Sequence, residues 1–74
     1  MFDENYYLTL IGRKLKDYGI NTYNHENGEY DYRKIDNMIK NAKIEGILSY
    51  EEWSVEKVAK KVAIYLNGDA NGEF

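Results

Sequence analysis

The chain contains 74 residues with a formal net charge of -3, and it has neither cysteine nor proline. A chain of this length holds one small domain, and without cysteine it cannot form disulfide bonds, a thiolate metal site or a cysteine nucleophile. Its apolar runs are too short for a transmembrane helix, and the opening segment MFDENYY lacks the features of a signal peptide, so we expect a cytoplasmic protein.

The pattern of residues 3–18 predicts the first helix. Asp3 or Asn5 can cap its beginning, and Gly19 can end it in the left-handed conformation. Apolar residues recur there at spacings of 3, 4 and 3, which places them on one face: Leu8, Ile11, Leu15 and Tyr18. We expect this face to be buried against the rest of the domain.

A hairpin is predicted around residues 22–31, because Asn27-Gly28 is a strong signal for a two-residue turn. Such a turn would pair Glu26 with Glu29, His25 with Tyr30, and Tyr23 with Tyr32. The two aromatic pairs would share one face of the hairpin, which favours this pairing, whereas the two facing glutamates disfavour it.

The second helix is predicted over residues 32–45, with Asp31 as its N-cap. Gly46 can end this helix, and Ile47 can fold back as the apolar contact of a Schellman motif. The apolar face repeats the spacing of the first helix, and it consists of Tyr32, Ile35, Met38, Ile39 and Ala42.

The third helix is predicted to begin at Ser49, which forms a capping box with Glu52. Leu48 and Trp53 fit the hydrophobic staple that accompanies such a start. A break at Ser54 is an alternative, because this serine can cap a helix of its own. The apolar face of the third helix consists of Val55, Val58, Ala59, Val62, Tyr65 and Leu66.

Three amphipathic helices joined by short turns predict a mostly α, compact three-helix domain with a short β-hairpin around residues 22–31. We assign this domain to residues 1–66 and a polar C-terminal tail to residues 67–74. The alternative is a small α+β domain with a strand near residues 6–11, because strand-forming residues are frequent there and Gly12 costs a helix about 1 kcal/mol. A core of this size rarely supplies more than roughly 3–5 kcal/mol, so we also expect a homodimer.

Neither a catalytic site nor a metal site is expected. His25 is the only histidine, and its turn-like surroundings indicate a solvated loop residue. The segment 67–72 matches the first half of an EF-hand loop, but the glutamate that completes such a loop is missing. With one histidine and no cysteine, a structural zinc site is not expected either. We therefore predict a protein that is not an enzyme and binds no cofactor.

The charge pattern indicates a binding surface for protein rather than for DNA. The second and third helices could imitate a helix-turn-helix, but the chain is acidic and DNA binding needs a basic face, so we expect no direct nucleic-acid binding. Carboxylates can occupy a groove built for phosphates, and tyrosine and tryptophan are favoured interface anchors. The candidate binding residues are Glu26, Glu29, Asp31, Glu51, Glu52, Trp53 and Glu56.

Three features of the chain are distinctive: its short length, its bias toward residues with AT-rich codons and its opening run MFDENYYLTLIGRKLKDYGI. In these features it resembles the small early proteins of staphylococcal phages that inhibit host DNA replication. The resemblance implies a protein that binds the host sliding clamp, and some proteins of this kind fill a DNA-binding channel as acidic mimics. The chain has no glutamine and so lacks the usual clamp-binding peptide. We therefore expect the basic DNA channel to be the binding site. The alternative is a small helical regulatory module that binds an apolar groove on another protein.

Overall fold

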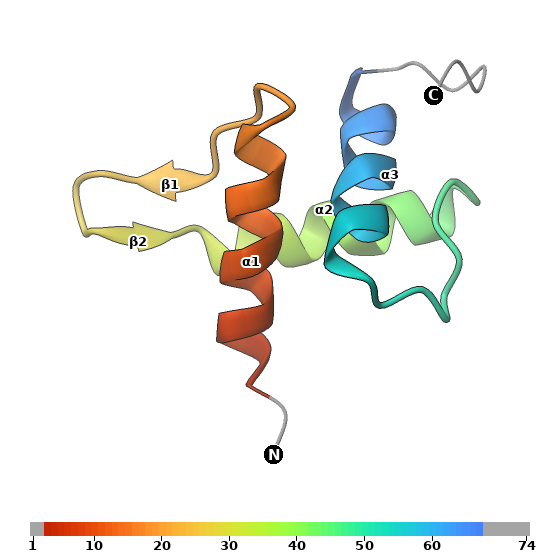
Figure 1. Ribbon diagram of the computed structural model, residues 1–74, viewed down its shortest axis with the longest axis horizontal. Helices are drawn as coiled ribbons and strands as arrows, with labels where there is room; N and C mark the ends of the chain where they lie inside the picture. The colour runs from red at the N-terminus through yellow and green to blue at the C-terminus, as the bar shows by residue number, and fades with distance from the viewer. Residues whose placement is uncertain (1–2, 68–74) are drawn as a thin grey trace.

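A computed structural model describes residues 3–67, which form three helices and a two-stranded antiparallel sheet (Figure 1). The elements follow in the order α1 (Glu4–Lys16), β1 (Tyr23–Asn24), β2 (Glu29–Tyr30), α2 (Tyr32–Ile44) and α3 (Val55–Asn67). The mostly α fold with a hairpin is therefore confirmed. The alternative strand near residues 6–11 is wrong, because these residues lie inside α1.

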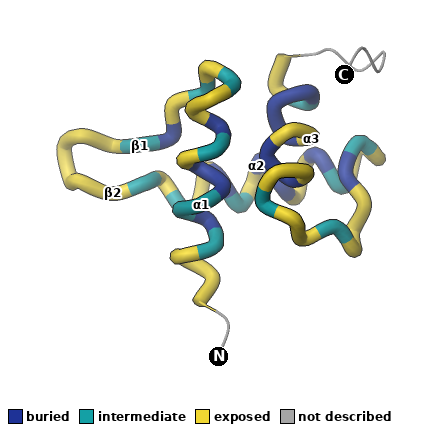
Figure 2. Tube along the Cα trace, viewed as in Figure 1, coloured by how far each residue is buried: buried dark blue, intermediate teal, exposed yellow. Residues whose placement is uncertain are grey.

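The core lies where the apolar faces of the three helices meet (Figure 2). It contains Leu8, Ile11, Leu15, Ile35, Met38, Ile39, Ala42, Leu48, Val58, Ala59 and Val62. The predicted apolar faces are confirmed at these helical positions. Leu66 is an exception, because it is 39% exposed. It belongs to the last turn of α3, where the neighbouring Ile64 is buried instead, at 6% exposed (Figure 1).

The helix ends follow the local signals in the sequence. The side chain of Asp3 accepts a hydrogen bond from the Tyr6 N–H at 3.1 Å, and the side chain of Asp31 accepts one from the Lys34 N–H at 3.1 Å. After α2, Gly46 has φ 78°, and the Ile47 N–H donates to the Ala42 carbonyl at 3.0 Å. This is the predicted Schellman motif, which only glycine enters without strain.

The hairpin forms with a different register from the predicted one. Tyr23 pairs with Tyr30, and Asn24 pairs with Glu29, so four residues rather than two connect the strands. The predicted pairs are wrong: Glu26 with Glu29, His25 with Tyr30, and Tyr23 with Tyr32. Tyr32 is not available to the sheet because it is the first residue of α2.

Local hydrogen bonds explain why the longer loop forms. The Gly28 N–H donates to the Asn24 carbonyl at 3.0 Å, with Gly28 at φ 71°. The side chain of Asn24 accepts from the Glu26 N–H at 2.9 Å, and that of Asn27 accepts from the Glu29 N–H at 3.0 Å. Asparagine therefore acts here through side-chain turns rather than in the two-residue turn that the sequence predicts.

The third helix begins later than the capping-box prediction. α3 starts at Val55, and Ser54 caps it: its Oγ lies 3.5 Å from the Lys57 N–H, which donates to it. Glu52 does not complete a capping box at Ser49, because its carboxylate turns forward and accepts from the Ser54 N–H at 3.2 Å. The capping box and the staple between Leu48 and Trp53 are therefore wrong, and the alternative start at Ser54 is confirmed. Asn67, the first residue of the predicted polar tail and of the EF-hand-like segment, is the last residue of α3, and residues 68–74 lie outside the described residues.

Candidate functional site

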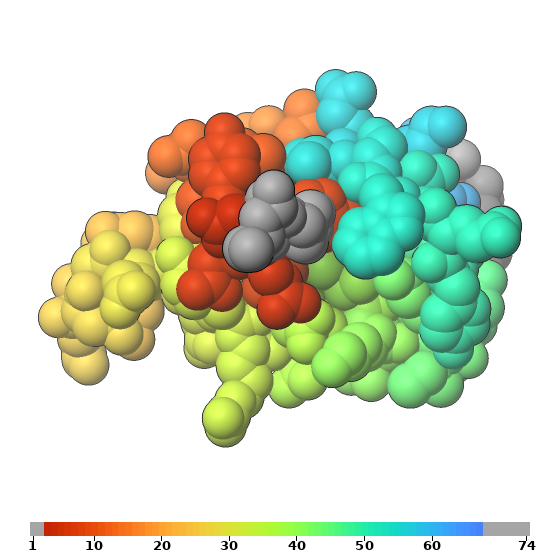
Figure 3. Space-filling model, turned by 90° about the horizontal axis from the view of Figure 1, so that it is seen from below, coloured from red at the N-terminus to blue at the C-terminus, as the bar shows by residue number. Residues whose placement is uncertain are grey.

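The most prominent surface feature is the acidic hairpin, defined here as residues 22–31. It projects from the side of the helical domain in Figures 1 and 3, and its connecting loop is exposed in Figure 2. Glu26 and Glu29 are exposed, and within the described chain neither carboxylate takes part in an ion pair. Asp31 is also exposed, but its Oδ1 already caps α2. The hairpin therefore carries two carboxylates without an internal partner.

Aromatic contacts hold the backbone below these carboxylates. The rings of Tyr23 and Tyr30 meet edge to face at 5.1 Å, and the ring of His25 meets Tyr23 at 4.8 Å. His25 is exposed in the loop, as the sequence predicts. These contacts add about 0.5–1.5 kcal/mol each beyond the burial of their surface, so the hairpin keeps a defined shape despite its short strands.

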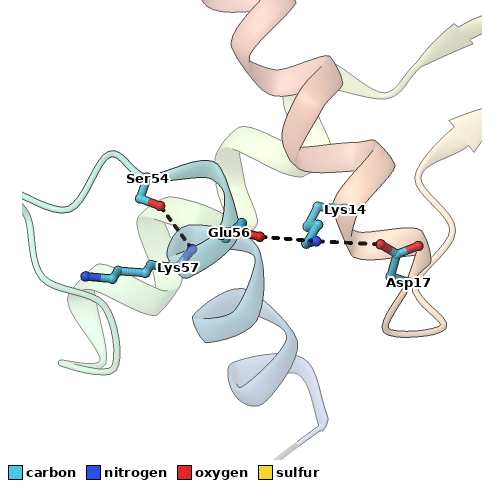
Figure 4. A network of polar contacts seen from close by, with 5 residues as sticks. All are labelled: Lys14, Asp17, Ser54, Glu56 and Lys57. Atoms are coloured by element: carbon cyan, nitrogen blue, oxygen red, sulfur yellow. Dashed lines mark hydrogen bonds and ion pairs between the residues drawn. The ribbon is translucent and has the colours of Figure 1, made fainter.

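The remaining candidate residues lie at the other side of the molecule, in the connection 45–54 and the first turn of α3 (Figure 1). Glu52 accepts the hydrogen bond from Ser54, and the Glu56 carboxylate lies 3.6 Å from Lys14 Nζ. Lys14 also lies 3.9 Å from Asp17, so one lysine joins two carboxylates across α1 and α3 (Figure 4). Glu51 is exposed and has no ion pair among residues 3–67.

Trp53 connects this second region to α1. Its ring lies 5.7 Å from the ring of Tyr7, and Lys43 Nζ lies 5.1 Å from the centre of the Trp53 ring. The Tyr7 hydroxyl donates to the Trp53 carbonyl at 2.9 Å. Burial, and then the charge of Glu52, raise the pKa of Tyr7 above its usual value of 10.0. Trp53 is still 58% exposed, so the same residue supports the fold and contributes to the surface.

Basic side chains surround the second region. Lys57, Lys60 and Lys61 line a hollow of about 530 Å³ between α3 and the turn after α2, and Glu52 lies on the same wall. Together with Lys43 over Trp53, they give this region a mixed charge. The structure therefore does not bring the seven candidate residues into one acidic face. It separates a hairpin that contains three carboxylates and no lysine or arginine of its own, with Arg33 beside Glu29 and Asp31, from a region where lysines accompany the glutamates.

Gly12 supports the site, although it lies in α1 and not in the hairpin. The sequence pattern did not identify it, because a glycine at this position was considered only as a residue that destabilises the helix. Gly12 is buried, and its missing side chain leaves the space occupied by the Tyr30 ring at the base of the hairpin. The signal in the sequence was a glycine in the middle of an otherwise regular helical pattern, which often marks a close approach of another segment.

No metal or membrane element is seen in the described part of the chain. Within residues 3–67, no group of three or more histidine, aspartate or glutamate side chains could hold a metal ion. No helix in this range is long and apolar enough to cross a membrane.

Comparison with known proteins gives no relative. No family model matches the chain, and it has no match among curated proteins or solved structures. The interpretation of function therefore depends on the geometry and charge described above.

Proposed function

We propose that this protein is a phage-encoded inhibitor of DNA replication that binds the bacterial sliding clamp in the host cytoplasm. It occupies the basic DNA channel of the clamp as an acidic mimic of DNA. The observation that carries the proposal is the acidic hairpin, a projecting element on which Glu26 and Glu29 are exposed and have no ion-pair partner among residues 3–67. A projecting acidic element can enter a concave basic surface that a flat acidic face cannot reach.

The chemistry of such a channel supports the match. Lysine and arginine side chains that hold DNA phosphates form equally good charge-assisted hydrogen bonds with carboxylates. Each exposed pair contributes little, in the range of about 0.2–1 kcal/mol, so several must act together. Attraction between opposite potentials also speeds the encounter of the two proteins.

A homodimer is part of the proposal. Two copies carry a formal charge of -6, twice the -3 of one chain, and present two acidic hairpins to a channel wide enough for duplex DNA. Sedimentation at micromolar concentration tests the dimer, and a species of 8.7 kDa under all conditions contradicts it.

The alternative function is a helical interaction module that binds an apolar groove on another protein. Tyr50, which is 67% exposed, and Trp53 favour it, because exposed aromatic side chains are frequent hot spots in interfaces. This alternative places the contact on the opposite side of the molecule from the acidic hairpin.

Salt and competition separate the two functions. If the channel is occupied, binding to a purified sliding clamp should weaken strongly as salt rises, and primed DNA loaded in the clamp should compete with the protein. The protein alone should not shift duplex DNA in a gel. Binding that persists at high salt and tolerates DNA in the channel would refute the mimic and favour the apolar groove.

A further inference from the structure

Gly12 lies directly beneath the acidic hairpin. A Cβ atom placed on this residue would lie 2.6 Å from Cδ1 and 2.9 Å from Cε1 of Tyr30. Non-bonded carbon atoms pack at about 3.5–4.0 Å, so the Tyr30 ring occupies the volume that any other side chain would need. Alanine is a better helix former than glycine, and the glycine in the middle of α1 is therefore explained by the hairpin and not by the helix.

Both arms of the hairpin meet α1 at this point. Tyr30 ends β2, and on the other arm Thr22 precedes β1, with its Oγ1 3.0 Å from the same Cβ position on Gly12. Thr22 is only 4% exposed, and its carbonyl accepts a hydrogen bond from the Asp31 N–H at 2.8 Å. The hydrogen bond between Asp31 and Thr22 thus closes the base of the hairpin, and the side chains of Thr22 and Tyr30 pack against Gly12.

The hairpin contributes little that could fix its own direction. Each strand has two residues, and isolated two-stranded hairpins are marginally stable in water. The contact of Tyr30 with α1 therefore determines where the hairpin that carries Glu26 and Glu29 points.

We infer that Gly12 is a positioning residue for partner binding: by leaving room for Tyr30, it sets the direction in which the hairpin presents Glu26 and Glu29. The effect on binding rests on the proposed function, whereas the effect on the hairpin itself does not. Gly12 makes no contact with the partner in this scheme and acts through the base of the hairpin, mainly through Tyr30, whose ring atoms lie nearer to the Cβ position than Thr22 Oγ1 does.

A double-mutant cycle with Tyr30 tests the contact. Gly12→Ala should lower Tm by about 5 °C or more in the wild-type background, although alanine favours the helix. In a Tyr30→Ala background, the same Gly12→Ala change should leave Tm unchanged or raise it. If Gly12→Ala alone does not fold, the addition of Tyr30→Ala should restore folding. A Gly12→Ala change with the same effect in both backgrounds would overturn the inference.

Binding to the sliding clamp tests the positioning role. Gly12→Ala should weaken the affinity about tenfold, and the amide NMR shifts that it causes should concentrate in residues 22–31. In a Glu26→Gln/Glu29→Gln background, Gly12→Ala should change the affinity less than about twofold, because the hairpin no longer contributes. A purely structural role would weaken binding equally in both backgrounds.

The outcomes separate this inference from the proposed function. Unchanged binding by Gly12→Ala, together with weak binding by Glu26→Gln/Glu29→Gln, would overturn the positioning role and leave the proposed function intact. Unchanged binding by Glu26→Gln/Glu29→Gln would instead refute the hairpin as the clamp-binding element. In that case, the role of Gly12 in binding falls with the proposed function, but displaced hairpin amides in Gly12→Ala and the reversal in the Tm cycle would still support its role in placing the hairpin. Their absence would overturn that role too.

Discussion

The acidic hairpin and the segment 45–56 contain the same kinds of residue but differ in their electrostatic environments. Both carry several carboxylates beside aromatic residues. In the hairpin, Glu26 lies in the projecting loop and Glu29 begins β2, and neither has an ion pair among residues 3–67, whereas Glu52 accepts a hydrogen bond, Glu56 is ion-paired, and lysines lie nearby. Acidic residues close together in a sequence therefore do not define an acidic surface, because the fold determines which of them keep their charge available.

The largest expected effect comes from reversing the hairpin charge. Glu26→Lys/Glu29→Lys should lower the affinity for the sliding clamp about 100-fold, or about 2.7 kcal/mol, through lost attraction and new repulsion. Either change alone should have a much smaller effect. The matched control, Glu45→Lys/Glu51→Lys, makes the same change in net charge in the other region and should cost less than about fivefold. Calorimetric titration measures both, and equal losses would remove the distinction between the regions.

The second region should instead depend on Trp53 for stability. Trp53→Ala should lower the free energy of unfolding by about 1–2 kcal/mol, because the Tyr7 ring and the Lys43 ammonium both lose their contact with the indole. Tyr50→Ala is the control, since Tyr50 is more exposed, and it should change stability by less than about 0.5 kcal/mol. Urea unfolding of the two variants provides the measurement. A Trp53→Ala variant of wild-type stability that no longer binds the clamp would assign the binding role to this region.

The start of α3 can be tested with two serines. Ser54→Ala should cost about 1 kcal/mol, because the N-cap of α3 is lost. Ser49→Ala should cost less than about 0.5 kcal/mol, because its hydroxyl only supports an exposed turn through the Glu51 N–H. Thermal unfolding followed by circular dichroism compares the two. A larger loss of stability for Ser49→Ala than for Ser54→Ala would instead support a helix that begins at Ser49.

The smallest effect concerns Tyr7 at alkaline pH. Its pKa is raised in the folded protein, mainly by burial and then by Glu52, above the value of 10.0 expected in the unfolded chain. The folded state therefore holds this proton more tightly, and the corresponding stability is fully present below pH 10.0 and lost as pH rises through the raised pKa. The stability difference between wild type and Tyr7→Phe should accordingly shrink above that pH in urea titrations. A stability difference between the two proteins that stays constant above pH 10.0 would contradict the raised pKa of Tyr7.

The sequence was sufficient for features that depend on one element. The apolar faces of α1 and α2 follow from helical spacing, and the caps at Asp3 and Asp31 depend on residues three positions away. The glycine after α2 was predicted for the same reason, because its φ of 78° is a local requirement.

Features that require a choice between similar local structures, or a contact between distant segments, were not predicted. Two turns compete around Asn27, and the hydrogen bonds that the Asn24 side chain and carbonyl accept favour the longer loop. Ser49, in the middle of the connection 45–54, and Ser54, at its end, both satisfy the rules for an N-cap, so the local pattern alone could not choose between them. The ion pair between Lys14 and Glu56 and the place of Tyr30 on Gly12 exist only once the helices have packed.

The hydrogen bond from the Tyr7 hydroxyl to the Trp53 carbonyl has a consequence for how the chain folds during synthesis. It joins residues 46 positions apart, and the Lys14–Glu56 pair likewise joins α1 to α3, the first and last helices of residues 3–67. At about 5–20 residues per second, a ribosome needs several seconds to make the segment between them. During that time the apolar face of α1 has no α3 to cover it. A chain that stops before α3 should therefore be a substrate for chaperones and proteases rather than a smaller folded protein.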